Sequence, residues 1–425
     1  MTNENRAPAS ESIMVVGGGI SGLTTALEAA EVGYEVYVVE QNPYLGGRVA
    51  QLNQYFPKLC PPTCGLEINF RRIKDNPRVK VITLAEVQKV EGGPGNYDVT
   101  VTIQPRYVNE KCTACGDCAE ACGVEVGDNF NFGMGSKKGA YLPFELAFPA
   151  RYILAPEIIG TDAARKAADA CKYDAIDLAM QAQSLELKVG AIVWATGWEP
   201  YDAARIDNLG FGRHPNIITN MMMERLAAPN GPTKGRITRP SDDKAPESVA
   251  FVQCAGSRDE NHLPYCSYIC CMASLKQATY VRERYPEAKI YIFYIDMRAP
   301  GQRYEKFYQT IKEDEKVFFI KGKVAEVDAD PATGAITVVA ENAVSGEKIK
   351  QTVDLVVLAT GMQPTAANTK LPADLNYNAD GFMINDFEKG GMFAAGCANK
   401  PADVVSSNQN ATGMALKAIQ TLARK

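Results

Sequence analysis

Histidine is scarce in this chain of 425 residues, because only His214 and His262 occur. Haem ligation and imidazole acid–base catalysis therefore have few candidate residues. Basic residues are not in excess either: the formal net charge is −5, which gives no electrostatic case for nucleic acid. No apolar run reaches the length of a membrane span. The first twelve residues, MTNENRAPASES, lack the apolar region of a signal peptide, so a cytoplasmic chain is expected.

Cysteine is present and grouped. Twelve cysteines in a chain of this length are too sparse for a secreted disulfide scaffold. Their clustering in short motifs indicates metal or redox chemistry in a reducing compartment. The length allows two or three domains, each large enough for its own core.

A dinucleotide-binding fingerprint lies near the N-terminus. Ser12–Val16 reads as a strand, the run Gly17-Gly18-Gly19-Ile20-Ser21-Gly22 follows, and a helix is expected as far as Gly33. Gly17, Gly19 and Gly22 let the backbone approach a pyrophosphate at the helix N-terminus. A second strand ends at Glu40, whose carboxylate can accept hydrogen bonds from an adenosine ribose. The acid alone does not distinguish NAD from FAD.

The next motif, Gly46-Gly47-Arg48, combines a tight backbone with a guanidinium suited to phosphate, although a surface loop is the alternative. This part of the chain resembles the FAD domain of the glutathione and thioredoxin reductase class. Ile20, Ser21, Gln41, Gly47 and Val87 complete the candidate cofactor-binding residues here. Cys60 and Cys64 are either a redox pair or loop cysteines beside the flavin, and we favour the second.

Segments 79–90 and 97–104 alternate like strands of a small sheet, which a cysteine motif then interrupts. Its spacing, Cys112-x2-Cys115-x2-Cys118-x3-Cys122, is that of bacterial ferredoxins. In two-cluster ferredoxins the fourth cysteine of such a run serves the other cluster. Cys171 lies in a degenerate second motif, so we expect one 4Fe-4S cluster on Cys112, Cys115, Cys118 and Cys171. Cys122 is the alternative fourth ligand.

A second cysteine group follows the apolar strand 249–252. Cys254 stands where a nucleotide-binding fold carries its glycine-rich loop, and Cys270 and Cys271 are expected to open a helix reaching about residue 285. With Cys266 the group has four thiols, which suit an iron–sulfur cluster or zinc. Zinc sites usually have two pairs of cysteines with a short gap in each, and adjacent cysteines after a long gap do not fit that spacing. Four buried structural cysteines are the remaining alternative. We expect a second 4Fe-4S cluster in place of NAD, with Arg258 and Lys276 raising potentials if they lie nearby.

Two similar strand–turn motifs, Ala195-Thr196-Gly197 and Ala359-Thr360-Gly361, resemble the ends of the FAD and second domains of that class. Gly396 matches its last FAD-binding strand, but Cys397 stands where an aspartate is usual. The expected fold is α/β, with two Rossmann-like, thioredoxin-reductase-type domains and a ferredoxin-like insertion. The expected boundaries are 1–105, 184–199 and 366–425 for the FAD domain, 106–183 for the insertion and 200–365 for the second domain. The helix 407–422 is expected to point its N-terminus toward the flavin pyrimidine.

The order of these parts is similar to that in the HdrA protein of heterodisulfide reductase, on the motifs Cys254-x11-Cys266-x3-Cys270-Cys271, Gly46–Leu52 and Gly396-Cys397-Ala398. The short chain and degenerate second motif resemble the QmoA proteins of the quinone-interacting membrane-bound oxidoreductases (Qmo) of sulfate-reducing bacteria. The resemblance implies FAD, two 4Fe-4S clusters and electron relay between menaquinol and adenylylsulfate reductase. It also implies two partners, a QmoB-like flavoprotein–ferredoxin and a QmoC-like membrane haem b protein that holds the chain at the cytoplasmic face of the membrane. The alternatives are a soluble HdrA-type complex, bifurcating or sulfur-oxidising, and an NAD(P)H-dependent flavoprotein reductase.

Overall fold

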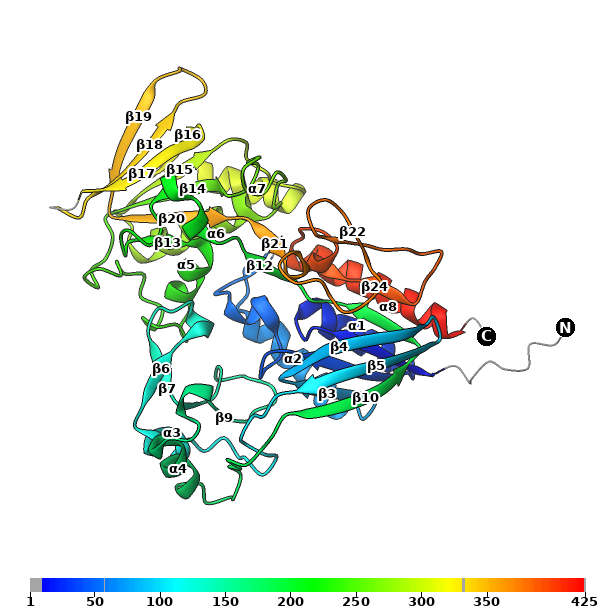
Figure 1. Cartoon of the computed structure of the whole chain (residues 1–425). Helices are drawn as coiled ribbons and strands as arrows, with labels where there is room; N and C mark the ends of the chain where they lie inside the picture. Colours follow the sequence, from blue (N-terminus) through cyan, green and yellow to red (C-terminus); the bar gives the residue numbers. More distant parts are fainter. Residues whose placement is uncertain (1–9, 57, 331–332, 424–425) are drawn as a thin grey trace.

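The computed structural model describes residues 10–56, 58–330 and 333–423. Most of the polar N-terminal segment considered above lies outside these ranges. Figure 1 shows three parts: a central unit around α1, a unit around β14 to β20 above it, and the inserted segment below. Each of the two larger units contains its own parallel sheet.

The central unit is built on a parallel sheet with the order β24-β11-β1-β2-β3. The inner strands carry consecutive apolar residues that are buried on both faces, such as Ile13, Met14 and Val15 of the first strand, as in parallel sheets generally. The helices α1 and α8 pack against each other and on one face. The elements are β1 (Ser12–Val16), α1 (Ile20–Glu31), β2 (Glu35–Glu40), α2 (Pro62–Asp75), β3 (Val79–Thr83), β11 (Ala191–Trp194), β24 (Met392–Ala394) and α8 (Val404–Ala423).

An antiparallel sheet with the order β10-β5-β4 covers the opposite face through a shared core that includes Met14, Val99 and Trp194. Its strands are β4 (Ala85–Gly93), β5 (Asn96–Ile103) and β10 (Gln183–Val189). The sequence predicts one small-sheet segment over 79–90, and this is wrong. Leu84, with a φ of 56°, breaks the segment, so that its first half joins the parallel sheet and its second half begins the antiparallel one.

The second unit repeats the plan with a parallel sheet in the order β13-β20-β14-β15-β16 and an antiparallel sheet β17-β18-β19. Strands β12 (Trp198–Pro200) and β21 (Met362–Pro364) pair where the chain passes between the units. The other elements are β13 (Ile217–Thr219), α5 (Asn220–Ala227), β14 (Ser248–Ala255), α6 (Cys270–Arg284), β15 (Lys289–Tyr294), α7 (Gln302–Lys312), β16 (Val317–Lys321), β17 (Val324–Ala329), β18 (Ile336–Glu341), β19 (Lys348–Val353) and β20 (Leu355–Thr360).

The inserted segment leaves the antiparallel sheet after β5 and returns at β10. Its short elements surround a small core formed by Val108, Leu154 and Ala164 among others. They are α3 (Asp117–Cys122), β6 (Glu125–Gly127), β7 (Ser136–Lys138), β8 (Ala140–Tyr141), β9 (Ile153–Leu154) and α4 (Asp162–Asp169). A hairpin of β22 (Asn376–Tyr377) and β23 (Met383–Ile384) precedes the last strand.

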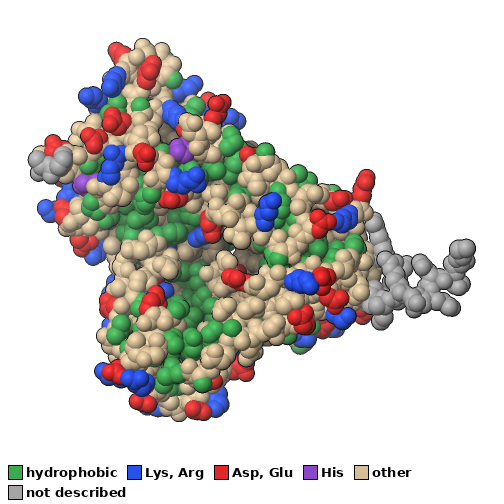
Figure 2. Space-filling model, viewed as in Figure 1, with side chains coloured by type: hydrophobic (Ala, Val, Ile, Leu, Met, Phe, Trp, Pro, Cys, Tyr) green, Lys and Arg blue, Asp and Glu red, His purple; other side chains and the backbone are tan. Residues whose placement is uncertain are grey.

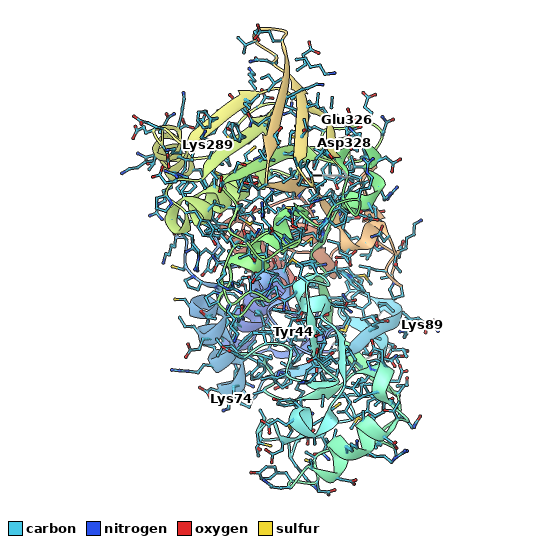
Figure 3. All side chains as sticks on the ribbon, turned by 90° about the vertical axis from the view of Figure 1, so that its left-hand side faces the viewer. Tyr44, Lys74, Lys89, Lys289, Glu326 and Asp328 are labelled. Carbon is cyan, nitrogen blue, oxygen red and sulfur yellow. The ribbon has the colours of Figure 1, made fainter. Side chains whose placement is uncertain are left out.

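The surface mixes acidic and basic side chains over the face in Figure 2, and hydrophobic side chains gather over the inserted segment at its lower left. Figure 3 shows Tyr44 near the middle of the molecule, below the second unit, whereas Lys74, Lys89 and Lys289 lie outside. No helix among the residues described combines the length and apolar character that a membrane crossing requires.

Candidate functional site

A cleft with a volume of about 1080 Å³ lies among the three parts of the chain. Lining residues come from the first unit, the inserted segment and the second unit. Thirteen of the expected cofactor-binding residues line it, namely Gly17, Gly19, Ile20, Ser21, Glu40, Gln41, Gly47, Arg48, Val87, Ala195, Thr196, Gly197 and Cys397. The structure therefore brings together residues that stand up to 380 positions apart in the chain (397 − 17 = 380).

Two expected residues, Gly22 and Gly396, do not line the cleft and have a packing role instead. A Cβ on Gly22 would lie 1.8 Å from the carbonyl oxygen of Gly17, and one on Gly396 would lie 2.1 Å from Ser21 Oγ. Neither site has room for a side chain. These glycines let the helix and the last turn approach the nucleotide loop closely.

The second glycine motif packs directly on the first. The Gly46 N–H donates to the Gly18 carbonyl at 2.8 Å, and a Cβ on Gly47 would lie 2.9 Å from the Gly19 Cα atom. Gly46 and Gly47 both hold positive φ angles, 112° and 54°, which glycine adopts without strain. The two loops form one backbone surface at the N-terminus of α1, a position that favours a phosphate.

Glu40 is buried at the end of β2, and its carboxylate is held by three N–H donors. Gly18 N donates to Oε2 at 2.6 Å, while the backbone and side-chain nitrogens of Asn42 donate to Oε1 at 2.7 Å each. Burial raises the pKa of this carboxyl, and the hydrogen bonds partly offset the rise. The carboxylate lines the cleft, where its remaining acceptor capacity is available to a ribose.

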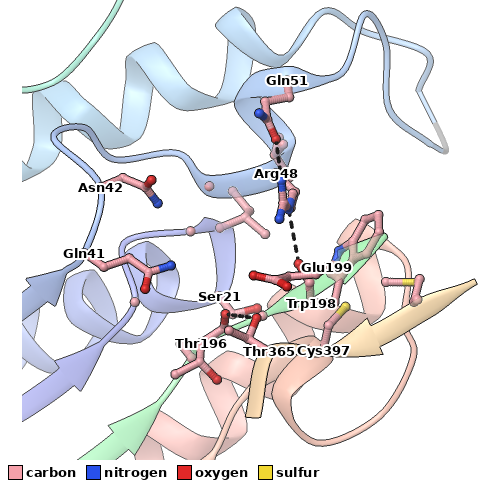
Figure 4. Close-up of a pocket in the computed structure, with 18 of the residues that line it drawn as sticks. Ser21, Gln41, Asn42, Arg48, Gln51, Thr196, Trp198, Glu199, Thr365 and Cys397 are labelled. Atoms are coloured by element: carbon pink, nitrogen blue, oxygen red, sulfur yellow. Dashed lines mark hydrogen bonds between the residues drawn. The ribbon is translucent and has the colours of Figure 1, made fainter. Parts of the chain in front are cut away.

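Arg48 is held in place by neutral acceptors (Figure 4). Its Nε donates to the Trp198 carbonyl at 3.1 Å and its Nη1 donates to Gln51 Oε1 at 3.2 Å. Burial lowers the pKa of the guanidinium, and nearby Glu199 opposes that effect. Neither hydrogen-bond acceptor is charged, so the guanidinium forms no hydrogen-bonded ion pair and can bind an anionic ligand in the cleft.

Two buried polar atoms on the cleft wall test whether a ligand fits there. Thr196 Oγ1 and Trp194 Nε1 have no hydrogen-bond partner among the residues described, and both residues line the cleft. A buried donor without a partner is costly, so such atoms usually meet a ligand or water. With the paired glycine loops, Glu40 and Arg48, these residues fit a dinucleotide that carries a polar ring system, as FAD does.

The thiol of Cys397 lies at the C-terminal side of the cleft. Its Sγ is 3.4 Å from the Ala402 carbonyl, and burial raises the pKa of the thiol to about 11, so it is neutral. Helix α8 begins beside it, earlier than the expected residue 407, and Asp403 caps it by accepting from Ser406 N at 2.7 Å. Asp403, Val404 and Ser407 line the cleft, so the first turn of α8 faces the cavity.

The second unit contributes one face of α6 to the same cleft. Cys270, Ala273, Lys276 and Gln277 recur at helical spacing and all line the cavity. Lys276 Nζ lies 3.0 Å from the carboxylate of Glu224, and both side chains are almost completely buried. Gln277 Nε2 donates to the same carboxylate at 2.6 Å. A cysteine of the second group therefore shares a helix face with a buried charge pair of the cleft.

The four thiols of that second group are mutual neighbours at the end of β14 and the start of α6. Burial raises the pKa of Cys254 to about 11, and Cys271 and Cys266 contribute in the same direction. The pKa of Cys270 is raised by burial and then by the other three thiols. Thiols that repel one another when ionised are suited to a metal centre, which removes their protons.

Backbone strain marks the same loop. Cys254, Arg258 and Tyr268 hold left-handed conformations, with φ of 57°, 54° and 67°. Such conformations in residues other than glycine cost free energy and cluster at functional sites. Arg258 lies near Cys254 and forms an ion pair with Asp296 at 3.0 Å, so both expected cationic residues lie close to a cysteine group or the cleft.

The first cysteine group lies in the inserted segment. Cys112, Cys115, Cys118 and Cys171 line one small cavity, together with Tyr152 and Ile176 among others. Burial is the main cause that raises the pKa of Cys118 to about 11, and the other three thiols raise it further. Cys122 is absent from this cavity; its Sγ packs in the apolar core, 3.0 Å from where a Cβ on Gly139 would lie.

Within the described residues, no group of three or more His, Cys, Asp or Glu side chains is arranged to hold a single metal ion. A 4Fe-4S cluster has a different geometry, because each cysteine binds a different iron and the thiols stand around the cluster. The donor sets are all sulfur, which suits iron–sulfur. The residues of both groups thus fit a cluster better than an isolated ion.

Cys60 and Cys64 do not line the cleft. Cys64 is exposed in the first turn of α2. Cys60 forms a β-bridge with Tyr55, and Tyr55 does line the cleft.

The sequence did not indicate several of the residues that line the cleft, because no motif marks them. These are Asn42, Tyr44, Lys137, Tyr141, Trp198, Glu199, Asn220, Glu224, Gln277 and Asp403. Asn42 alone had a signal, its position two residues after Glu40, at the end of the strand expected to contact a ribose.

Comparisons with known proteins agree with this fold. The family described as NAD(P)-binding Rossmann-like domain matches residues 15–80. The thioredoxin reductase of Lactococcus lactis superposes with a TM-score of 0.53 at 12% identity, over 98% of this chain and 100% of that one. At this identity the likeness concerns the fold alone. The predicted fold class, α/β with thioredoxin-reductase-type domains, is confirmed.

Two relatives are similar over nearly the whole chain. A CoB--CoM heterodisulfide reductase iron-sulfur protein of the HdrA type from Methanopyrus kandleri is 38% identical over 423 residues, 96% of this chain and 64% of that protein. The corresponding protein of Methanocaldococcus jannaschii is 38% identical over 421 residues, 95% of this chain and 63% of that protein. The chain thus spans somewhat less than two thirds of these relatives.

The expected partners are corrected by these findings. QmoB-like and QmoC-like proteins and adenylylsulfate reductase were expected from a resemblance based on the short chain and its degenerate second ferredoxin motif. This expectation is wrong, because the relatives belong to heterodisulfide reductases. Membrane association through those partners loses its basis as well. The relatives are subunits of heterodisulfide reductases, which are oxidoreductases, and an oxidoreductase subunit is what the sequence led us to expect.

Proposed function

We propose that this chain is an FAD- and iron–sulfur-containing electron-transfer subunit of a heterodisulfide reductase-like complex. The observation that carries the proposal is the continuity of one cleft, which runs from the glycine loops at Gly17 and Gly47 to Cys270 of the second cysteine group. A flavin bound in this cleft would share its lining with Cys270 of the second group. Bound FAD exchanges one or two electrons, and 4Fe-4S clusters exchange them singly.

The chain's own residues would hold these groups and exclude water. The loops at Gly17–Gly22 and Gly46–Arg48 would bind the pyrophosphate, and Glu40 the adenosine ribose. Thr196 would supply a hydrogen bond that the protein leaves unmade. Lys276 lines the same cleft as an ammonium paired with Glu224, and it would offer a hydrogen-bond donor to a bound group.

We further propose Cys112, Cys115, Cys118 and Cys171 as ligands of one cluster and Cys254, Cys266, Cys270 and Cys271 as ligands of the other. The shared cavity of the first set and the mutual proximity of the second support this assignment. Cys115 and Cys266 are exposed, so each cluster would have a side open to an electron partner. Other subunits of a heterodisulfide reductase-like complex are the partners that the relatives favour.

The test is to quantify flavin, iron and sulfide in the purified chain and to record EPR spectra of cysteine variants. Cys171→Ala and Cys270→Ala are each expected to lose about half of the bound iron and one EPR signal, because each removes one ligand of one cluster. Cys122→Ala is the matched control and is expected to keep both signals. Loss of a signal in Cys122→Ala, with Cys171→Ala unaffected, would reverse the assignment of the first cluster.

A full-length chain without bound flavin or iron would refute the proposed function. Reduction of the flavin by NADPH alone would instead favour a pyridine-nucleotide-dependent reductase. We expect no such reduction, because Cys254 occupies the place of the nucleotide loop in the second unit.

A further inference from the structure

Two buried polar side chains beside the second cysteine group have no partner. Gln253 is 4% exposed and Ser274 is fully buried. Among the residues described, neither amide atom of Gln253 nor the hydroxyl of Ser274 makes a hydrogen bond. Buried polar groups in proteins are nearly always paired, so these three atoms require an explanation.

The position of Gln253 follows from the alternation of side chains along β14. Val249 and Phe251 belong to the core that α6 covers, whereas Ala250 and Val252 belong to the core on the other face of the sheet. Because successive side chains in a strand point to opposite faces, Gln253 lies on the α6 side. It directly precedes Cys254, and a register shift between Val252 and Ala255, with Cys254 at a φ of 57°, interrupts the alternation there.

Ser274 comes from the facing helix. It follows Cys271 by three residues and Cys270 by four, so it lies on the same face of α6, one turn further along. Helix α6 packs on β14 and β20. The amide therefore comes from the residue before Cys254 and the hydroxyl from the helix turn after Cys270 and Cys271, so both belong to the elements that carry three of the four thiols.

We propose that the Gln253 amide N–H and the Ser274 hydroxyl donate hydrogen bonds to sulfur atoms of the cluster held by Cys254, Cys266, Cys270 and Cys271, and so raise its reduction potential. The cluster's sulfurs carry more negative charge after reduction, so N–H and O–H donors stabilise the reduced form more than the oxidised form. The inference rests on the proposed cluster and names two positioning residues that act on its potential.

The test is an EPR-monitored redox titration of the complete, iron-loaded chain. Gln253→Met keeps the length of the side chain and removes both amide donors. We expect its ratio of reduced to oxidised second cluster at a fixed potential to fall about tenfold, which is ~59 mV for one electron. Ser274→Ala removes only the hydroxyl, and a shift in the same direction is expected. The first cluster serves as the internal reference, and its potential is expected to stay unchanged.

Ser248→Ala is the matched control, because Ser248 stands at the other end of β14 and its hydroxyl donates to Asp354 at 3.0 Å. It is expected to leave both potentials unchanged. Unchanged potentials in Gln253→Met and Ser274→Ala, with full iron content, would overturn the inference and show that these groups bond to something else, such as a buried water. If Gln253→Met fails to assemble the cluster, Ser274→Ala alone decides. Absence of iron from the wild-type chain would instead refute the proposed function.

Discussion

The carboxylate of Glu40 combines burial with hydrogen bonds from two backbone N–H groups and one side-chain amide. Burial raises its pKa above the ordinary value of 4.5, although Gly18 and Asn42 donate three hydrogen bonds to it. The rise in pKa caused by burial is therefore larger than the fall caused by the three hydrogen bonds. The three hydrogen bonds therefore depend on pH, since the charged form of the carboxyl is the one that accepts on both oxygens.

Glu40→Gln is expected to destabilise the chain by about 1–3 kcal/mol at pH 7. The amide nitrogen would replace one carboxylate oxygen and would face an N–H group that now donates a hydrogen bond to that oxygen. A raised pKa in the folded state means that Glu40 favours folding at pH below 4.5 and loses that contribution as pH rises through the folded value. In Glu40→Gln this pH-dependent part should vanish. Urea unfolding midpoints of both proteins across this pH range would measure it, and identical pH slopes would contradict the argument.

At the scale of elements, helix α6 connects the cleft with the second cysteine group. Its N-terminal turn carries Cys270 and Cys271, and its next turns place Lys276 and Gln277 against Glu224 of α5. Lys276 also donates to the Gln54 carbonyl of the central unit, and Asn53 N donates to Glu224 at 3.0 Å. The buried pair thus holds α5 and α6 against the segment that follows Arg48.

Glu224→Ala is expected to cost about 3–5 kcal/mol, because it leaves the Lys276 ammonium buried without its counter-charge. The double variant Glu224→Gln with Lys276→Met is expected to recover most of that loss, since no buried charge remains unpaired. Thermal unfolding of the single and double variants, monitored by the rise in fluorescence as flavin is released, would measure both changes in stability. A double variant as unstable as Glu224→Ala would show that packing, rather than charge, dominates this contact.

At the scale of the whole molecule, Arg225 ties the three parts together. Its side chain is fully buried and donates to Asn131 of the inserted segment at 2.7 Å, to the Gln51 carbonyl at 3.2 Å, and to Asn230 of the second unit at 2.8 Å. Its guanidinium also lies 4.8 Å from the ring centroid of Phe130. Burial lowers the pKa of the guanidinium to about 10, so it remains charged at neutral pH. These contacts hold the second unit at one orientation to the cleft.

Arg225→Ala is expected to loosen that orientation, because it leaves acceptors from all three parts unpaired. Hydrogen–deuterium exchange should rise in segments 51–56 and 129–132, while the parallel sheets keep their protection. Arg71→Ala removes an exposed pair with Glu67 and is the control, with no change expected in those segments. Exchange that rises throughout the chain would indicate global destabilisation instead of a released contact.

Much of the local design could be predicted from the sequence. The run from Gly17 to Gly22, the strand ending at Glu40 and the strand before Cys254 all lie where their patterns indicated. The break at Leu84 was missed, because alternation continues through it and only the tertiary partner of each half differs. Short elements such as α5 and β13 also escaped notice, since three to eight residues carry too little periodicity.

The sequence by itself determined the nucleotide loop and the spacing of each cysteine motif, because these depend on neighbours within a few residues. Only the tertiary structure decided that Cys171, and not Cys122, shares a cavity with Cys112, Cys115 and Cys118. It also decided that one face of α6 lines the same cleft as the glycine loops. The physical reason is that both outcomes depend on packing between segments far apart in the chain, which no local pattern encodes.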